Sequence, residues 1–148
     1  MNIAGVARLL VCVVLVGFLS AGCQRVKTEQ QVKTLDESHK TYGKMLRWKE
    51  YEQAVRYIVP REGPAKSLDL ESLDDVRITS YEVVDKLIVQ DENEAVITVK
   101  IEFYVEDTGK VHSLRDEQNW WYEPEAERWF LDDSLPDFEA AMRAGRRR

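Results

Sequence analysis

The sequence predicts an α+β domain in which an N-terminal helix or helix pair packs on a curved four-stranded antiparallel meander. Two periodicities support this prediction. Apolar residues recur at three- and four-residue steps from about Val32, as on a helix, and at two-residue steps from Val76, as on a strand. Turn-forming residues separate the stretches of two-residue period, so the strands are expected to follow one another as hairpins. Helices that precede a meander, rather than alternate with strands, are typical of an α+β layout.

The helical region divides into two segments. Its apolar phase shifts near 47–49, which indicates a second helix or a bend. Pro60 ends the region, because the residue before a proline avoids the helical conformation, and 61–67 is expected to be a loop. The first apolar stripe consists of Leu35, His39, Tyr42, Met45 and Leu46, and the second of Tyr51, Ala54, Val55 and Ile58.

Four strands are predicted after the loop. The clearest alternates apolar and polar side chains over Glu94–Glu106. The strand before it slips out of alternation near Val84–Lys86, which predicts a β-bulge or a second pairing partner. Gly109 suits the left-handed conformation of a short hairpin. The other predicted strands are Arg77–Val89, Lys110–Tyr122 and Arg128–Leu131, with turns at 91–93, 107–109 and 123–127.

The N-terminus has the features of an export signal. Arg8 precedes the apolar run Leu9–Leu19, which is about half the ~20 residues that a membrane-spanning helix needs. The following Ala21-Gly22-Cys23 resembles the lipobox of bacterial lipoproteins, with Ser20 where that pattern favours leucine. The resemblance implies cleavage before Cys23 and acylation of this cysteine with palmitate-type chains. An ordinary secretory signal with a chance cysteine is the alternative.

These boundaries predict a signal peptide at 1–22, a lipidated tether at 23–31, a single domain at 32–142 and a basic tail at 143–148. Acyl chains on Cys23 would hold the protein on a membrane. Lipoproteins with aspartate after the cysteine tend to stay in the inner membrane, and Gln24 occupies that position here. By this resemblance the protein is expected on the outer membrane, facing the periplasm. Cys12 lies in the signal, so no disulfide is expected in the mature chain.

The charge of the mature chain argues against nucleic-acid binding. Removal of the signal, which contains Arg8 and no acidic residue, leaves 20 basic against 27 acidic residues, a net charge of −7. The basic tail 143–148 is the exception. We expect it to be solvated, and contact with anionic lipid or polysaccharide is the alternative.

Two stretches resemble the nuclear-transport-factor-two-like superfamily, a cone-shaped α+β fold found in ketosteroid isomerase and in many small bacterial envelope proteins. Arg47–Ala54 is similar to the junction of the family's first two helices, and Trp120–Tyr122 with Arg128–Leu131 is similar to its closing hairpin. Pro124 and Ala126 occupy the turn where the family often has glycine, and a smaller helix-plus-sheet fold is the alternative. The superfamily contains enzymes, binders and assembly modules, so the resemblance implies no single activity.

The polar run Arg115–Asn119 interrupts a predicted strand and is the main candidate for chemistry. In a cone fold, side chains of this strand that face the helices can line a pocket, where a carboxylate with a raised pKa could act as a base. The bland interpretation is an edge or solvent-facing segment kept polar to prevent strand pairing. His39 and His112 have no partners at metal-ligand spacing, so neither a metal nor a cofactor is predicted. The residues to inspect are Asp85, Arg115, Glu117, Tyr42, Tyr57, Tyr81 and Tyr104.

Neighbouring Trp120 and Trp121 must point to opposite faces of their strand. One is expected to pack under the helices. The other would mark a dimer or partner surface, unless Leu135–Met142 covers it. The predicted pocket or interaction residues are therefore Tyr42, Tyr81, Tyr104, Arg115, Glu117, Trp120 and Trp121, and no residue is predicted to be catalytic.

These features together favour a lipid-anchored envelope protein with a non-catalytic binding or assembly domain. Its expected partners are the membrane, through Cys23, and a second copy or another envelope protein. The alternative is a small-molecule-binding or isomerase- or hydratase-like enzyme that uses the cone pocket.

Overall fold

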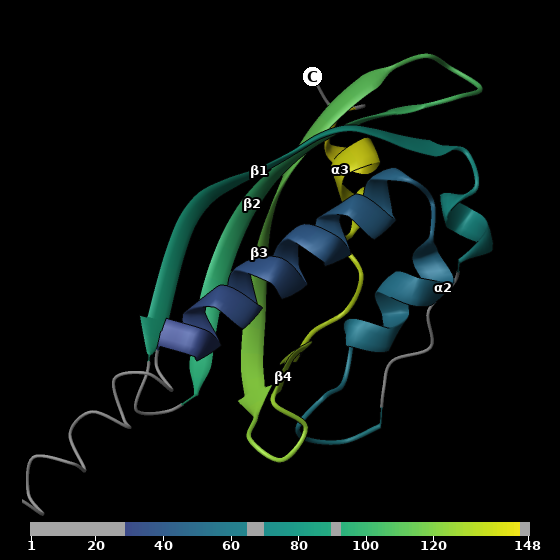
Figure 1. Cartoon of the computed structure of the whole chain (residues 1–148). Helices are drawn as coiled ribbons and strands as arrows, with labels where there is room; N and C mark the ends of the chain where they lie inside the picture. The colour runs from purple at the N-terminus through teal and green to yellow at the C-terminus, as the bar shows by residue number, and fades with distance from the viewer. Residues whose placement is uncertain (1–28, 65–69, 90–92, 146–148) are drawn as a thin grey trace, which may run out of the picture.

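The computed structural model describes residues 29–64, 70–89 and 93–145. It confirms the predicted α+β fold: helices lie against one face of an open four-stranded antiparallel sheet (Figure 1). The sheet order follows the chain, as in a meander. The predicted signal peptide 1–22, residues 23–28 of the predicted tether and residues 146–148 of the predicted tail lie outside the described residues. The strands are β1 (Val76–Val89), β2 (Glu94–Val105), β3 (Val111–Glu123) and β4 (Arg128–Leu131).

The helical region has the two predicted segments. The first helix covers 29–47, so it includes 29–31, which the sequence had assigned to the tether. Trp129 holds this part of the helix on the sheet, because its indole Nε1 donates a hydrogen bond to the Gln31 carbonyl at 3.0 Å. Lys49, with φ of 62°, turns the chain into the second segment. That segment consists of α2 (Tyr51–Ala54) and a 3₁₀ helix (Val55–Tyr57), and a second 3₁₀ helix (Glu71–Leu73) precedes β1.

The long strand β1 is irregular, as the sequence indicated. Its pairing with β2 shifts between Val83 and Asp85, which confirms the predicted bulge, and shifts again between Ile78 and Ser80. Bulges increase the twist of a strand, and β1 curves strongly along the sheet (Figure 1). β1 is an edge strand of the described sheet.

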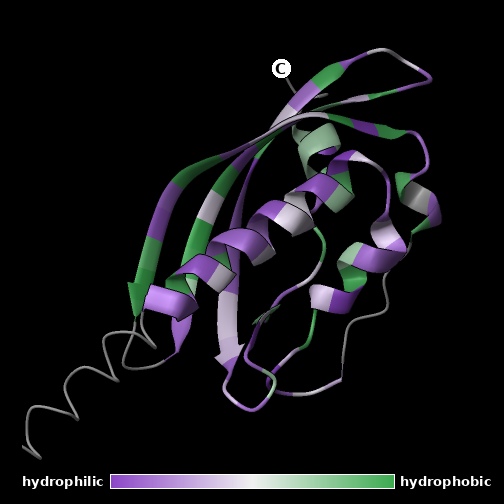
Figure 2. Cartoon of the chain, in the orientation of Figure 1, coloured by the Kyte–Doolittle hydropathy of each residue, from purple (hydrophilic) through white to green (hydrophobic). Residues whose placement is uncertain are grey.

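The core lies between the helices and the concave face of the sheet. The inward side chains of β2 are buried from Ala95 to Phe103, as their two-residue period predicted. Leu35, Tyr42 and Leu46 of the first helix pack against them. The colouring by hydropathy shows apolar and polar residues following one another along β2 (Figure 2).

The C-terminal part of the domain packs on the concave face too. α3 (Phe138–Gly145) places the Phe138 ring edge-on to Phe103, with ring centroids 5.0 Å apart.

The β2–β3 turn is as predicted: Gly109 has φ of 63°, and its N–H donates to the Val105 carbonyl at 2.8 Å. No helix among the described residues is long and apolar enough to cross a membrane.

Candidate functional site

The structure divides the seven predicted site residues between the two faces of the sheet. Tyr42, Tyr81 and Trp120 lie on the concave side, under or beside the first helix. The strand register and the alternation of side chains place Tyr104, Arg115, Glu117 and Trp121 on the convex side. The seven residues therefore do not form one site.

Arg115 and Glu117 do not face the helices, so the pocket interpretation of the polar run does not hold for these two residues, whose placement agrees with the solvent-facing interpretation. The register of β3 fixes Trp120 inward, so Gln118 and Asp116 point inward with it. Arg115 and Glu117 are exposed on the outer face, as is Asp85 of β1. Asp116 is therefore the carboxylate of this run that lies under the helix.

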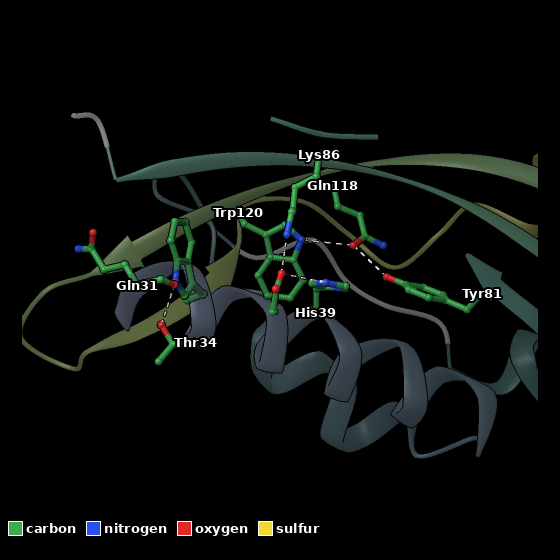
Figure 3. A network of polar contacts seen from close by, with 9 residues as sticks. Gln31, Thr34, His39, Tyr81, Lys86, Gln118 and Trp120 are labelled. Atoms are coloured by element: carbon green, nitrogen blue, oxygen red, sulfur yellow. Dashed lines mark hydrogen bonds and ion pairs between the residues drawn. The ribbon is translucent and has the colours of Figure 1, made fainter. Parts of the chain in front are cut away.

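A hydrogen-bonded network surrounds the Gln118 side chain, which is fully buried. The Tyr81 hydroxyl and the Trp120 indole Nε1 donate to Gln118 Oε1 at 3.0 and 3.3 Å, and Gln118 Nε2 donates to Asp116 Oδ2 at 2.8 Å. Figure 3 shows Tyr81 and Trp120 converging on Gln118 from two strands. Burial of these polar groups is stable because they pair with one another.

The network contains acids that hold their protons more tightly than usual. Burial raises the pKa of Asp116, and the nearby charge of Asp133 adds to the increase, while the hydrogen bond from Gln118 opposes it. Burial also raises the pKa of the Tyr81 and Tyr42 hydroxyls, which therefore stay protonated.

Aromatic rings fill the space beside this network. Tyr42, Tyr57 and Trp120 contact one another edge to face, with centroids 5.8 to 6.2 Å apart. Tyr42 is 0% exposed and Trp120 is 1% exposed. The Tyr42 hydroxyl is buried without a hydrogen-bond partner in the described part of the chain. The concave side is thus closed here by packed side chains.

A groove opens on the other side of Tyr81, between the first helix and β1. We call it the helix–β1 groove; it has a volume of about 290 Å³ and is lined by His39, Lys40, Gly43, Lys44, Arg47, Trp48, Tyr81 and Val83. Trp48 is 71% exposed. Gly43 allows the close approach of helix and strand, because a Cβ at this position would lie 2.6 Å from Cε1 of Tyr81.

The helix–β1 groove is positively charged. Within the described ranges, Lys40, Lys44 and Arg47 form no ion pair, in contrast to Lys86, whose Nζ lies 2.6 Å from Asp36 Oδ1. These three cations follow one another at four- and three-residue steps, so they lie along one side of the helix.

His39 is a buried polar group in the lining of this groove. Its Nε2 lies 3.6 Å from Asp36 Oδ1, and its Nδ1 has no hydrogen-bond partner among the described atoms. Burial lowers the pKa of His39, although Asp36 opposes this, so the imidazole is neutral at pH 7. A carboxylate facing Nε2 favours the proton on that nitrogen, which leaves Nδ1 as an unused acceptor.

Trp121 on the convex face is half-buried by contacts within the chain, and its role at a dimer or partner surface stays a prediction. Its indole Nε1 donates to the Val59 carbonyl at 2.9 Å, and its ring packs on Phe130 with centroids 5.4 Å apart. The segment Leu135–Met142 does not cover it, since Phe138 packs on Phe103 in the core. Trp48 is therefore the more exposed tryptophan.

Two other hollows lie on the described surface, one of about 300 Å³ beside α2 and one of about 200 Å³ near Gln31 and Tyr122. The first is lined by the acidic Glu50, Glu52, Glu71 and Asp74, among others. No group of three or more histidine, cysteine or carboxylate side chains in the described residues is placed to hold a metal ion. No protein-family model, curated protein or solved structure matches this chain.

Proposed function

We propose that this chain is a lipid-anchored cell-envelope protein whose α+β domain is a non-catalytic binding or assembly module. The anchor in this proposal is the lipobox-like Cys23, and the partner is another envelope protein or a second copy. The contrast between the two sides of Tyr81 supports the binding role. The side toward Gln118 and Trp120 is filled, whereas the side toward Lys44 and Trp48 has a groove with an exposed tryptophan. Exposed aromatic side chains are enriched at binding surfaces.

The anchor is tested by growing a bacterial host that expresses the full chain with radiolabelled palmitate. The wild type is expected to incorporate the label and to sediment with the outer membrane. Cys23→Ser is expected to lose the label, while Cys12→Ser, in the signal, keeps it. Label retained in Cys23→Ser would contradict the anchor.

An isomerase- or hydratase-like enzyme is the second candidate, and Asp116 is the observation that favours it. This carboxyl has a raised pKa, and the Tyr42 hydroxyl, which has no hydrogen-bond partner among the described residues, lies near enough for the two groups to interact electrostatically. Such an enzyme would have to open the contact between Tyr42 and Trp120 to admit a substrate.

Native mass spectrometry of the full chain bearing Cys23→Ser distinguishes the two candidates. A binding module is expected to show the mass of the polypeptide without a small-molecule adduct. A copurified organic ligand that is lost in Tyr42→Trp, which enlarges the ring under the helix, would instead support the enzyme or small-molecule binder.

A further inference from the structure

We propose that the helix–β1 groove binds an extended acidic segment of another protein. This inference rests on the proposed binding role and names the site and the chemistry of the partner. Two features of the groove carry it: a row of cations and an exposed apolar rim.

The row of cations fits a chain that runs along the helix. Lys40 and Arg47 are seven residues apart, a rise of roughly 10 Å, and Lys44 lies between them. An extended segment covers this length with about three residues, and its alternate side chains lie on one side at roughly 6.6 Å. The rise is about 6 Å from Lys40 to Lys44 and about 4.5 Å from Lys44 to Arg47, so two acidic side chains at alternate positions would lie within reach of the three cations. A single small anion would leave part of the row without a partner.

The rim of the groove fits the rest of such a segment. Trp48 and Val83 are exposed at the rim and can cover an apolar side chain of the partner. The groove is a hollow of about 290 Å³ between the helix and β1, so the side chains of a single extended chain can enter it, whereas a flat lipid surface would contact its rim alone.

The charge of the whole chain adds selectivity. The mature chain has a net charge of −7, so most of its surface repels an acidic partner, while Lys40, Lys44 and Arg47 attract it to one place. This arrangement steers a charged partner to the groove and makes its association rate depend on salt.

The test measures fluorescence anisotropy of a labelled octapeptide of alternating glutamate and valine, added to the full chain bearing Cys23→Ser. The reference is the matching octapeptide of lysine and valine. The Glu–Val peptide is expected to bind more tightly than the Lys–Val peptide, and the difference is expected to shrink at high salt. Lys44→Glu/Arg47→Glu is expected to weaken Glu–Val binding by about tenfold.

A control variant with the same change of charge is available. Arg56 and Arg115 are exposed and lie outside the groove, so Arg56→Glu/Arg115→Glu is expected to keep the affinity within about twofold. Lys44→Gln/Arg47→Gln, which adds no negative charge near the helix end, guards against unfolding and is expected to lose about threefold. Circular dichroism checks the fold of each variant.

Three results would overturn the inference: equal losses in the two Glu variants, equal affinity for the two peptides, or no peptide binding together with groove-dependent binding to phosphatidylglycerol vesicles. The last result would assign the groove to a lipid surface. A partner crosslinked at Trp48 in cells, with a yield that Lys44→Gln/Arg47→Gln leaves unchanged, would preserve the binding role and reject only the acidic chemistry.

Discussion

The two regions that meet at Tyr81 use polar groups in opposite ways. On the concave side, its hydroxyl joins a network in which Gln118, Trp120 and Asp116 satisfy one another. On its other side, its ring lines the helix–β1 groove, whose cations form no ion pair in the described structure. Polar groups that pair inside a core define the fold, whereas charged groups left available at a surface can recognise a partner. Trp120 lies in the core and Trp48 lies at the groove, so Trp120 is expected to contribute to stability and Trp48 to binding.

The largest expected effect comes from Trp120→Ala. This change leaves a cavity beside Tyr42 and Tyr57 and removes a donor to Gln118, so it is expected to lower the free energy of unfolding by about 3–5 kcal/mol. Trp48→Ala, at an exposed position, is expected to change it by less than about 0.5 kcal/mol. Urea unfolding of the two variants measures the difference, and equal losses would contradict the division into core and surface.

Gly43→Ala tests the contact between Gly43 and Tyr81, where the two regions meet. The added Cβ would lie 2.6 Å from the Tyr81 ring, which must move and disturb both the groove and the network. The clash is expected to outweigh the higher helix propensity of alanine, with a net loss of about 1–3 kcal/mol. Thermal unfolding checks this, with Lys44→Ala as the exposed control on the same helix. A melting temperature at or above that of the wild type would show that Gly43 and Tyr81 are loosely packed.

A smaller effect separates two buried tyrosines. Tyr81→Phe removes a donor to Gln118 and is expected to cost about 1 kcal/mol. Tyr42→Phe removes a buried hydroxyl that has no partner in the described structure, and it is expected to be neutral or stabilising. Chemical denaturation of both variants distinguishes them. A loss for Tyr42→Phe as large as that for Tyr81→Phe would indicate that the Tyr42 hydroxyl is hydrogen-bonded in solution.

The smallest expected effect depends on pH. Burial raises the pKa of Asp116 above its value of about 3.8 in the unfolded chain, so ionisation costs the folded state stability as the pH rises through these two values. Asp116→Asn removes this cost. Its stability relative to the wild type is therefore expected to increase as the pH rises above about 4 and then to level off. Urea titrations between pH 3 and 8 measure the difference, with the exposed Glu117→Gln as the control. A difference that does not vary with pH would contradict the raised pKa.

The sequence predicted the fold well because the features that determine it are local. The alternation of Ala95 to Phe103, the slip near Val84 and the glycine at 109 each indicate one element or turn, and each is confirmed. The start of the first helix was placed too late because the Trp129 contact that fixes it comes from a residue far along the chain.

The candidate site was harder to predict because it depends on which face each side chain takes. Arg115 and Glu117 were chosen over Asp116 and Gln118, although an inward Trp120 would have implied the opposite choice. The helix–β1 groove was missed because it needs the packing of Gly43 on Tyr81, which joins two elements far apart in sequence. The steps between Lys40, Lys44 and Arg47 were the signal available for it.

Site-specific photocrosslinking in the intact cell envelope tests the central claim most directly. A photoreactive amino acid replaces Trp48 at the groove in one strain and Asn119, exposed on the convex face of the sheet, in another. The proposed binding role at the helix–β1 groove predicts a discrete protein adduct from position 48 and none from position 119. An adduct from position 119 alone, or from neither position, would contradict it.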